Sequence, residues 1–301
     1  MTSALDQHQA SAPVASLQRA SKRERTLLGD ALRRLARNPL AVIGAVIVAF
    51  MVMMAIFADQ IAPYSPIEQN LLLYVQPPSA EHILGTDEVG RDVLSRIIHG
   101  ARISLQVSLL SVAIGLVVGT LVGLVAGFYD GIVDTLMMRL TDVFLAFPLL
   151  LLAIGLVAAL GPSENSAFLA LGLVTWPYVA RLARGQALSL KHYEFITAAH
   201  AIGASSFRIM LVHMLPNMLT PLIVYATTSI ANIILAESTL AFLGLGAQPP
   251  TPSWGGMLSD TRSFLLSAPW LPTYPGVAIF LASLGFNLLG DGLRDALDVK
   301  Q

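Results

Sequence analysis

The sequence contains no cysteine, which excludes disulfide bonds, thiolate metal sites and a cysteine nucleophile. Charged residues are also scarce, at 12% of the 301 residues, whereas hydrophobic residues make up 55% and occur in long runs. Soluble domains of this size carry fewer apolar residues, so the composition indicates an integral membrane protein. The net charge of −1 gives no sign of a nucleic-acid partner or of an anionic substrate.

Lysine occurs only three times, as Lys22, Lys191 and Lys300. A Walker A loop requires Gly-Lys-Ser/Thr, and these lysines follow serine, leucine and valine, so the chain cannot hydrolyse ATP with a P-loop. The sequence also has no His-Glu-x-x-His motif, no zinc-spaced cluster and no Gly-x-Ser-x-Gly motif. We therefore predict that this chain has no catalytic residue, holds no metal and binds no cofactor.

Apolar runs predict an all-α membrane protein with six transmembrane helices. The runs cover residues 39–58, 103–128, about 143–160, 167–180, about 218–245 and 274–289. About 20 apolar residues are enough to cross the hydrocarbon core of a bilayer. Glycines recur every four residues in the second run, at Gly115, Gly119, Gly123 and Gly127, which predicts the close approach of a neighbouring helix.

Basic residues are distributed unevenly between the two sides of this bundle. If both termini lie inside, only Arg91, Arg96, Arg102 and Arg262 of the 18 lysines and arginines fall outside. The positive-inside rule therefore places both termini, and the loop at 193–216, in the cytoplasm. The polar N-terminal segment 1–38 has no signal-peptide cleavage pattern, and we expect it to be retained.

A polar stretch, YEFITAAHAIGASSFRIMLVHMLP at 193–216, interrupts the apolar sequence. Its spacing predicts two short amphipathic helices joined by a turn at Gly203, because glycine takes positive φ readily at a helix end. Ser205 or Ser206 is expected to cap the second helix, and Pro216 to end it. The predicted apolar positions are Phe195, Ala198, Ala199 and Ile202 in the first helix and Phe207, Met210, Leu211, Met214 and Leu215 in the second.

On this pattern alone, the stretch is a loop lying on its own bundle or on lipid headgroups. The residues Ala198-Ala199, Gly203 and Leu215-Pro216 also resemble the EAA loop of ABC importer permeases, Ala-Ala-x-x-x-Gly followed by Leu-Pro. The resemblance implies a coupling helix that docks into a separate ATPase subunit, although Thr197 stands where the family usually has glutamate. It assigns ATPase coupling to Glu194, Ala198, Ala199, Gly203, Arg208, Leu215 and Pro216.

The segment LGTDEVGRDVLSRIIHGAR at 84–102 predicts a salt-bridged helix at the outer surface. Thr86 is expected to cap this helix, with i, i+4 ion pairs between Asp87 and Arg91 and between Asp92 and Arg96. A functional alternative is a contact with a partner permease or a substrate-delivering protein. The pattern GTDxxGRDxxSR resembles the C-type subunit of dipeptide and oligopeptide permeases.

The segment at 237–260 adds a second resemblance to that subunit, through FLGLGxQPPxPSWGxML. Its prolines stiffen an outer loop, and Trp254 suits a membrane-interface belt or, alternatively, a partner contact. Glu237 lies within a span, where an acid is energetically expensive, so it either lines the translocation path or pairs with a neighbouring helix. Asn232 is a further path candidate, although Asn232 and Asn287 could equally form hydrogen bonds between helices.

The resemblance extends over nearly all of the chain from residue 37 to residue 298 and implies the type I ABC importer permease fold. Together with the apolar runs and the distribution of basic residues, it divides the chain into a cytoplasmic N-terminal segment at 1–38, a first transmembrane helix and outer segment at 39–97, a five-helix core at 98–290 and a cytoplasmic tail at 291–301. The coupling loop within the core would cover 185–216. The implied location is the bacterial inner membrane.

The resemblance also implies three kinds of partner: a homologous second permease, two ATPase subunits that bind ATP and Mg, and an extracytoplasmic peptide-binding protein. The implied function is import of dipeptides or short peptides by alternating access, with nickel, glutathione and longer oligopeptides open as other substrates. A rival from another class is an ion-coupled secondary carrier, which would need several ionisable residues at mid-membrane depth. A non-transporting scaffold is a second rival, and it would not need the Ala-Ala-x-x-x-Gly loop.

Overall fold

The structure is a computed structural model that describes residue 29 and residues 33–297. Most of the predicted cytoplasmic N-terminal segment, and the last four residues of the predicted tail, lie outside this range. The described residues are helical and form no sheet, with one isolated bridge between Thr86 and Asp92. The predicted all-α fold class is confirmed.

Seven longer helices make up the bundle, and short helices lie in its connections. The longer helices are α2 (Pro39–Ile56), α4 (Val93–Tyr129), α5 (Gly131–Leu145), α6 (Leu149–Leu160), α7 (Glu164–Leu190), α10 (Leu215–Phe242) and α12 (Trp270–Leu297). The short elements are α3 (Ala58–Ile61), η3 (Leu71–Leu73), α8 (Glu194–Ala201), α9 (Ser206–Arg208), η4 (Ile209–Met214), α11 (Trp254–Asp260) and η5 (Arg262–Phe264).

The described chain has five helical segments long and apolar enough to cross a membrane, and a sixth only if α5 and α6 count as one span. These two helices meet at an angle of 87°, so the predicted run at about 143–160 is not one continuous helix. The break falls at Pro148, which lacks an amide hydrogen and pushes the preceding residue out of the helical region. The other five predicted runs each lie on one long helix.

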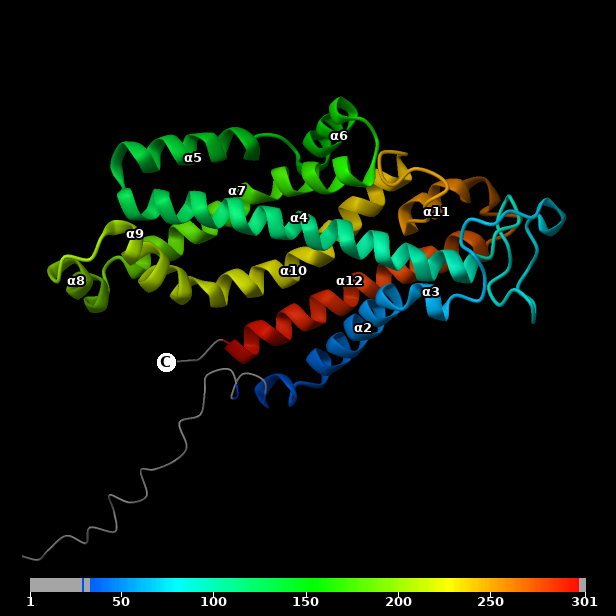
Figure 1. Cartoon of the computed structure of the whole chain (residues 1–301), viewed down its shortest axis with the longest axis horizontal. Coiled ribbons are helices and arrows are strands. Elements are labelled where there is room, and N and C mark those ends of the chain that lie inside the picture. The colour runs from blue at the N-terminus through cyan, green and yellow to red at the C-terminus, as the bar shows by residue number, and fades with distance from the viewer. Residues whose placement is uncertain (1–28, 30–32, 298–301) are drawn as a thin grey trace, which may run out of the picture.

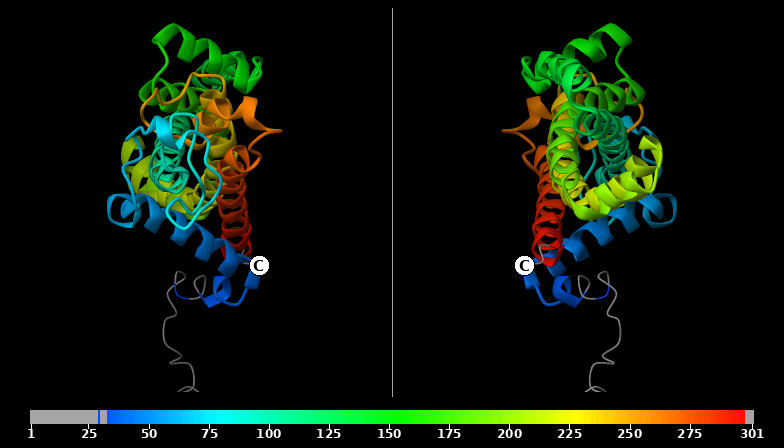
Figure 2. Two further views of the ribbon diagram at one scale, coloured as in Figure 1. Left: turned by 90° about the vertical axis from the view of Figure 1, so that its right-hand side faces the viewer. Right: turned by 90° about the vertical axis from the view of Figure 1, so that its left-hand side faces the viewer.

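The long helices run along one axis, with different connections at its two ends. Figure 1 shows α8 and α9 at one end of the bundle and α3 and α11 at the other. The start of α2 and the end of α12 point toward the α8 end. Seen along the axis, α2 and α12 lie on one side of the bundle and α5 and α6 on the opposite side (Figure 2). We call the end that carries α8 and α9 the loop end, and the end that carries α3 and α11 the cap end.

The seam between α4 and α7 is the most extensive helix contact in the bundle, and the glycine stripe of α4 lies in it. A Cβ atom on Gly119 would lie 2.5 Å from the carbonyl oxygen of Trp176, and one on Gly127 would lie 2.6 Å from the Ala187 Cβ. The backbones therefore approach as closely as only glycine permits. The predicted packing role of the stripe is confirmed.

Capping explains where two of the spans begin. The side chain of Asn38 accepts hydrogen bonds from the amides of Leu40 and Ala41, and Pro39 occupies the first position of α2. Helix α4 begins about ten residues before the predicted apolar run, because Asp92 caps it by accepting a bond of 2.8 Å from the Ser95 amide. Its first turns are buried beneath the outer segment rather than in lipid.

Candidate functional site

The stretch at 193–216 protrudes at the loop end and contains two short helices, α8 and α9, joined by a turn (Figure 1). Gly203 has φ +78°, and its amide bonds to the His200 carbonyl while the Ala204 amide bonds to the Ala199 carbonyl, both at 3.0 Å. This is a Schellman-type helix end, which requires the left-handed backbone that glycine adopts freely. The predicted turn is confirmed. Ser205 then caps α9 by accepting from the Arg208 amide.

The buried face of the loop differs from the predicted one. Ile196 and Ala199 are the buried residues of α8, whereas Phe195, Ala198 and Ile202 are exposed. The predicted stripe is therefore wrong for the first helix, because α8 rests on α4, α7 and η4 through the neighbouring face. In the second helix, Met210 and Met214 are buried as predicted, but Phe207 is 68% exposed.

The loop packs against a second apolar cluster at this end of the bundle. Its partners include Leu124 and Phe128 of α4 and Ala183, Ala187 and Leu190 of α7. The ring of His200 stacks on the ring of Phe128 with centroids 6.0 Å apart. These contacts pack α8 against α4 and α7, the two helices with the most extensive mutual contact.

Pro216 does not end the second helix. It lies in the first turn of α10, and the segment from Ser206 to Phe242 continues as one apolar span. The six residues directly before α10, Ile209–Met214, form a π-helix. At its end the Leu215 amide donates to the Met210 carbonyl. In a π-helix each amide bonds to the carbonyl five positions earlier, and this pattern lets the helix continue through Pro216, which has no amide hydrogen. Short π-helical segments of this kind are frequent at functional sites. Leu215 is half-buried and Pro216 exposed.

The coupling residues predicted from sequence thus fall into two groups. Leu215 is a packing residue, and Ala199 is buried beneath α8. The exposed members are Glu194, Ala198, Gly203, Arg208 and Pro216. Three apolar side chains flank these exposed residues, and Phe195 (40%), Ile202 (86%) and Phe207 (68%) expose large parts of their surface at the loop end. We call Phe195, Ile202 and Phe207 the loop patch.

The outer segment at 84–92 is not a helix, and Thr86 caps nothing. The Thr86 hydroxyl instead accepts from the Gln76 amide at 2.9 Å and donates to the Leu73 carbonyl. The predicted Asp87–Arg91 pair forms, with Arg91 Nε 2.6 Å from Asp87 Oδ2, but across a turn. The predicted Asp92–Arg96 pair does not form, because Asp92 caps α4 and binds His82 Nδ1 at 2.9 Å.

Arg96 joins a different cluster of charges at the cap end. Its Nε lies 3.3 Å from Asp87, and its Nη2 lies 3.8 Å from Asp260 at the end of α11. Burial raises the pKa of the Asp260 carboxyl, and burial also raises the pKa of Glu88, which lies 2.8 Å from Arg91. The cluster links the outer segment, α4 and α11. It forms from residues distant in sequence, so local i, i+4 spacing could not reveal it.

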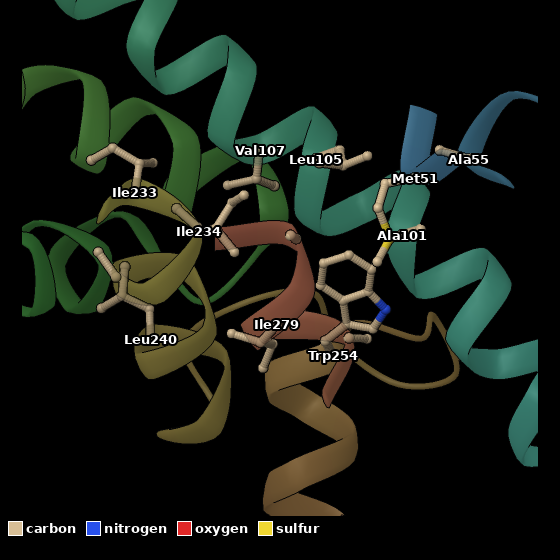
Figure 3. Close-up of a cluster of buried hydrophobic side chains, with 14 of the residues drawn as sticks. Met51, Ala55, Ala101, Leu105, Val107, Ile233, Ile234, Leu240, Trp254 and Ile279 are labelled. Carbon is tan, nitrogen blue, oxygen red and sulfur yellow. The ribbon is translucent and has the colours of Figure 1, made fainter. Parts of the chain in front are cut away.

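Trp254 is fully buried rather than placed in a membrane-interface belt. Its indole nitrogen donates to the Ile97 carbonyl of α4 at 3.0 Å. Figure 3 shows the ring among the apolar side chains of Met51, Ala101 and Ile279. Asp87, Arg91, Asp92 and Arg96 are also buried. The five residues predicted as outer partner contacts therefore lie beneath the surface of this chain and hold the cap end together.

Glu237 and Asn232, the two path candidates, lie on different faces of α10. Glu237 is 1% exposed, and its nearest bonded side chain is the Ser238 hydroxyl at 3.4 Å. Asn232 and Asn287 are exposed to the surroundings of the chain. A polar side chain on the outside of a membrane bundle faces water or protein rather than lipid. The path role of Asn232 and of Glu237 stays a prediction.

Sequence reasoning missed a group of ion pairs that joins α5, and the residue directly before it, to α7 and the residue directly after it. Arg184 Nη2 lies 2.6 Å from Asp134 and Arg181 Nη2 lies 2.7 Å from Asp142, while Lys191 binds Asp130 just before α5. Each partner lies 39 to 61 positions away, so only the pattern of acids at 130, 134 and 142 opposite a basic helix could have pointed to it. Among residues 29 and 33–297, no group of three or more histidines and acids is placed to hold a metal ion.

Comparisons with known proteins place these features in a family. Residues 119–301 match the family described as binding-protein-dependent transport system inner membrane component, and residues 26–78 match the N-terminal TM domain of oligopeptide transport permease C. The dipeptide transport system permease protein DppC of Escherichia coli (strain K12) is 53% identical over 270 residues, covering 88% of this chain and 90% of that protein.

Other relatives carry different names. A DppC of Alkalihalophilus pseudofirmus is 49% identical over 271 residues, covering 90% of this chain and 89% of that protein. The glutathione transport system permease protein GsiD of Shigella flexneri is 48% identical, covering 89% of each chain. The inward-facing MetNI methionine ABC transporter shares the fold, with a TM-score of 0.55 at 18% identity, over 68% of this chain and 97% of that one.

Proposed function

The chain belongs to the family of binding-protein-dependent transport system inner membrane components, and on this premise we propose that it imports dipeptides or short peptides as one subunit of an ATP-driven complex. It is a multi-pass membrane permease of the ABC peptide-importer type. The termini and the stretch at 193–216 face the cytoplasm in this proposal. The partners are a homologous second permease, two ATPase subunits and an extracytoplasmic peptide-binding protein.

The observation that carries the coupling role is the loop patch. Contiguous exposed apolar side chains on a soluble end of a protein mark sites of protein contact. Phe195 lies in α8, Ile202 follows its last residue directly, and Phe207 lies in α9, and all three side chains are exposed. We assign this patch to the ATPase subunit, which would receive the two short helices in a groove. Helix-in-groove docking uses apolar anchors of this kind.

The packing beneath the patch supplies the transmission step. Ile196 and Ala199 fix α8 to α4 and α7, and η4 runs directly into α10. When ATP and Mg close the ATPase pair, the docked loop moves, and the three long helices must move with it. This chain binds neither ATP nor Mg in the proposed mechanism. It supplies half of the translocation path, and the binding protein supplies most of the selectivity.

Substrate identity is the finer part of the proposal. The relatives at 44–53% identity named for dipeptides, di/tripeptides and glutathione support a short peptide. Nickel and longer oligopeptides remain the alternatives within the family. A secondary carrier working alone would need several ionisable residues at mid-membrane depth. In α10 the single acid is Glu237, which is buried among the helices of its own chain.

The coupling role is tested in proteoliposomes that hold the complete complex and its binding protein. We expect Gly203→Val to abolish ATP-driven uptake of a labelled dipeptide and to release the ATPase subunits during purification. The matched control is Gly244→Val at the cap end, because Gly244 has φ +79° and, as at Gly203, a Cβ added to it would meet no atom within 4 Å. Both variants carry the same backbone strain, on the order of 1–3 kcal/mol.

The control should retain its ATPase subunits. Normal uptake by Gly203→Val would disprove the coupling role, and uptake by this chain without any partner would disprove the ATP-driven complex. The rate of ATP hydrolysis, measured with dipeptides, longer peptides and nickel, then separates the substrate alternatives.

A further inference from the structure

A cavity of about 520 Å³ opens at the loop end between α7, α10 and α12. Its volume falls within the range of small-ligand sites. Thr220, Pro221, Val224, Tyr225 and Thr228 on the first half of α10 form one wall. Leu182 of α7 and Asp291, Arg294 and Leu297 near the end of α12 complete the lining. Nothing in the coupling role uses this space.

The two charges of the cavity have opposite sign and lie three positions apart on α12, so they occupy one face of the helix. Both side chains are exposed, and neither takes part in the ion pairs found between the described residues. In contrast, Arg181 and Arg184 in the groove between α5 and α7 each pair with an acid. Asp291 and Arg294 thus present a carboxylate and a guanidinium group to whatever enters the cavity.

The α10 wall adds uncharged polar groups. Tyr225 and Thr228 line the cavity, and Asn232 lies one turn beyond Thr228 on the exposed part of α10. Polar groups in this position face water or protein rather than lipid. The cavity therefore lies at the loop end of a row of polar side chains, and this row continues along α10 toward the middle of the bundle.

We propose that this cavity binds the zwitterionic backbone of a short peptide, with Arg294 receiving the terminal carboxylate and Asp291 the terminal ammonium group. An arginine binds a carboxylate in a bidentate geometry. Two extended residues span about 7 Å, and helix side chains three positions apart have Cβ atoms about 5–6 Å apart, so a dipeptide is long enough to reach both side chains at once. The site rests on the proposed import of short peptides and gives this chain a share in recognising them.

The site is tested by protection of a single cysteine, since the native chain has none. Thr220→Cys places a thiol on the exposed cavity wall, and Ser189→Cys places one on an exposed position of α7 outside the cavity. Each variant is assembled with its partner subunits in phosphatidylcholine nanodiscs, where peptide reaches both faces without the binding protein. Maleimide labelling of this chain is followed by intact mass.

We expect dialanine to slow the labelling of Thr220→Cys about threefold at twice its dissociation constant and to leave Ser189→Cys unchanged. N-acetyl-dialanine and dialanine amide each lose one charge-assisted contact and should protect about tenfold more weakly. Asp291→Asn should remove the difference between dialanine and its N-acetyl form. Arg294→Gln should remove the difference between dialanine and its amide, whereas Arg294→Lys should keep it.

Equal protection by capped and uncapped peptides, or no protection at all, overturns the site. A phospholipid headgroup carries the same pair of charges, so the labelling is repeated in phosphatidylethanolamine nanodiscs. Slow labelling there without peptide, with no further effect of dialanine, identifies a lipid site and also overturns the proposal. Uptake of labelled dipeptide by the wild-type complex is measured in parallel. Uptake without protection removes only this site, whereas absence of uptake removes the proposed function itself.

Discussion

The indole nitrogen of Trp254 donates a hydrogen bond to the carbonyl oxygen of Ile97 at 3.0 Å, which joins α11 to α4 across 157 positions of sequence. The ring is fully buried, and Gly100 on α4 leaves the space that the indole fills. This contact fixes the cap end, because α11 also carries Asp260 toward Arg96. Stability of the cap end should therefore depend on this one side chain.

We expect Trp254→Ala to destabilise the folded chain by about 3–5 kcal/mol, since it removes a large buried aromatic ring. Trp254→Phe keeps most of the apolar volume and loses the hydrogen bond, which should cost about 1 kcal/mol. The melting temperature of the purified protein in detergent measures both changes. If the two variants melted together with the wild type, the indole would not hold α11 in place.

A pair of adjacent alanines separates docking from folding. Ala198 is exposed on α8 and Ala199 is buried against α7 and α4. Ala198→Asp should keep the wild-type melting temperature while the ATPase subunits no longer co-purify. Ala199→Asp buries an unpaired carboxylate and should destabilise the chain by about 3 kcal/mol. Thr197→Ala should be mild in both assays, and retention of the ATPase subunits by Ala198→Asp would argue against the docking face.

The seam between α4 and α7 predicts a strict requirement for glycine. A Cβ on Gly123 would overlap the carbonyl oxygen of Ala180, so Gly123→Ala should cost about 1–3 kcal/mol through overpacking. Gly185 on the facing helix meets nothing within 4 Å, and Gly185→Ala should be neutral or stabilising by up to about 1 kcal/mol. Thermal unfolding of both variants in detergent gives the comparison. Equal melting temperatures would show that α4 and α7 move apart easily enough to accept the added methyl group.

The charge cluster at the cap end predicts a pH dependence of stability. Burial raises the pKa of Asp260 above its ordinary value of 3.8, so the folded chain holds a proton that the unfolded chain releases between the two values. Stability should therefore fall as the pH rises through that window. Melting temperatures of the wild type and Asp260→Asn, measured between about pH 4 and pH 7, test this. The wild type should lose more stability than the variant, and parallel curves would contradict the prediction.

Local patterns in the sequence predicted most of the fold. Long apolar runs located five spans, because membrane helices must satisfy every backbone group internally and cover them with apolar side chains. The four-residue spacing of glycines in α4 predicted the close approach of a neighbouring helix, which the structure identifies as α7, and Gly203 marked a left-handed turn that the structure contains. Each of these features depends on residues within a few turns of one another.

Features that depend on the packing of distant segments could not be predicted in this way. The spacing in α8 marks Phe195, Ala198 and Ile202 as apolar, but contact with α4 and α7 buries Ile196 instead. The spacing predicted that Asp92 pairs with Arg96. In the structure Asp92 binds His82 of the outer segment instead, and Arg96 lies close to Asp87 and Asp260. Helical periodicity gives only the apolar side of a helix and the residues within one turn of a charge. Which apolar side chains remain exposed, and which acid meets which base, is decided when helices far apart in the chain pack together.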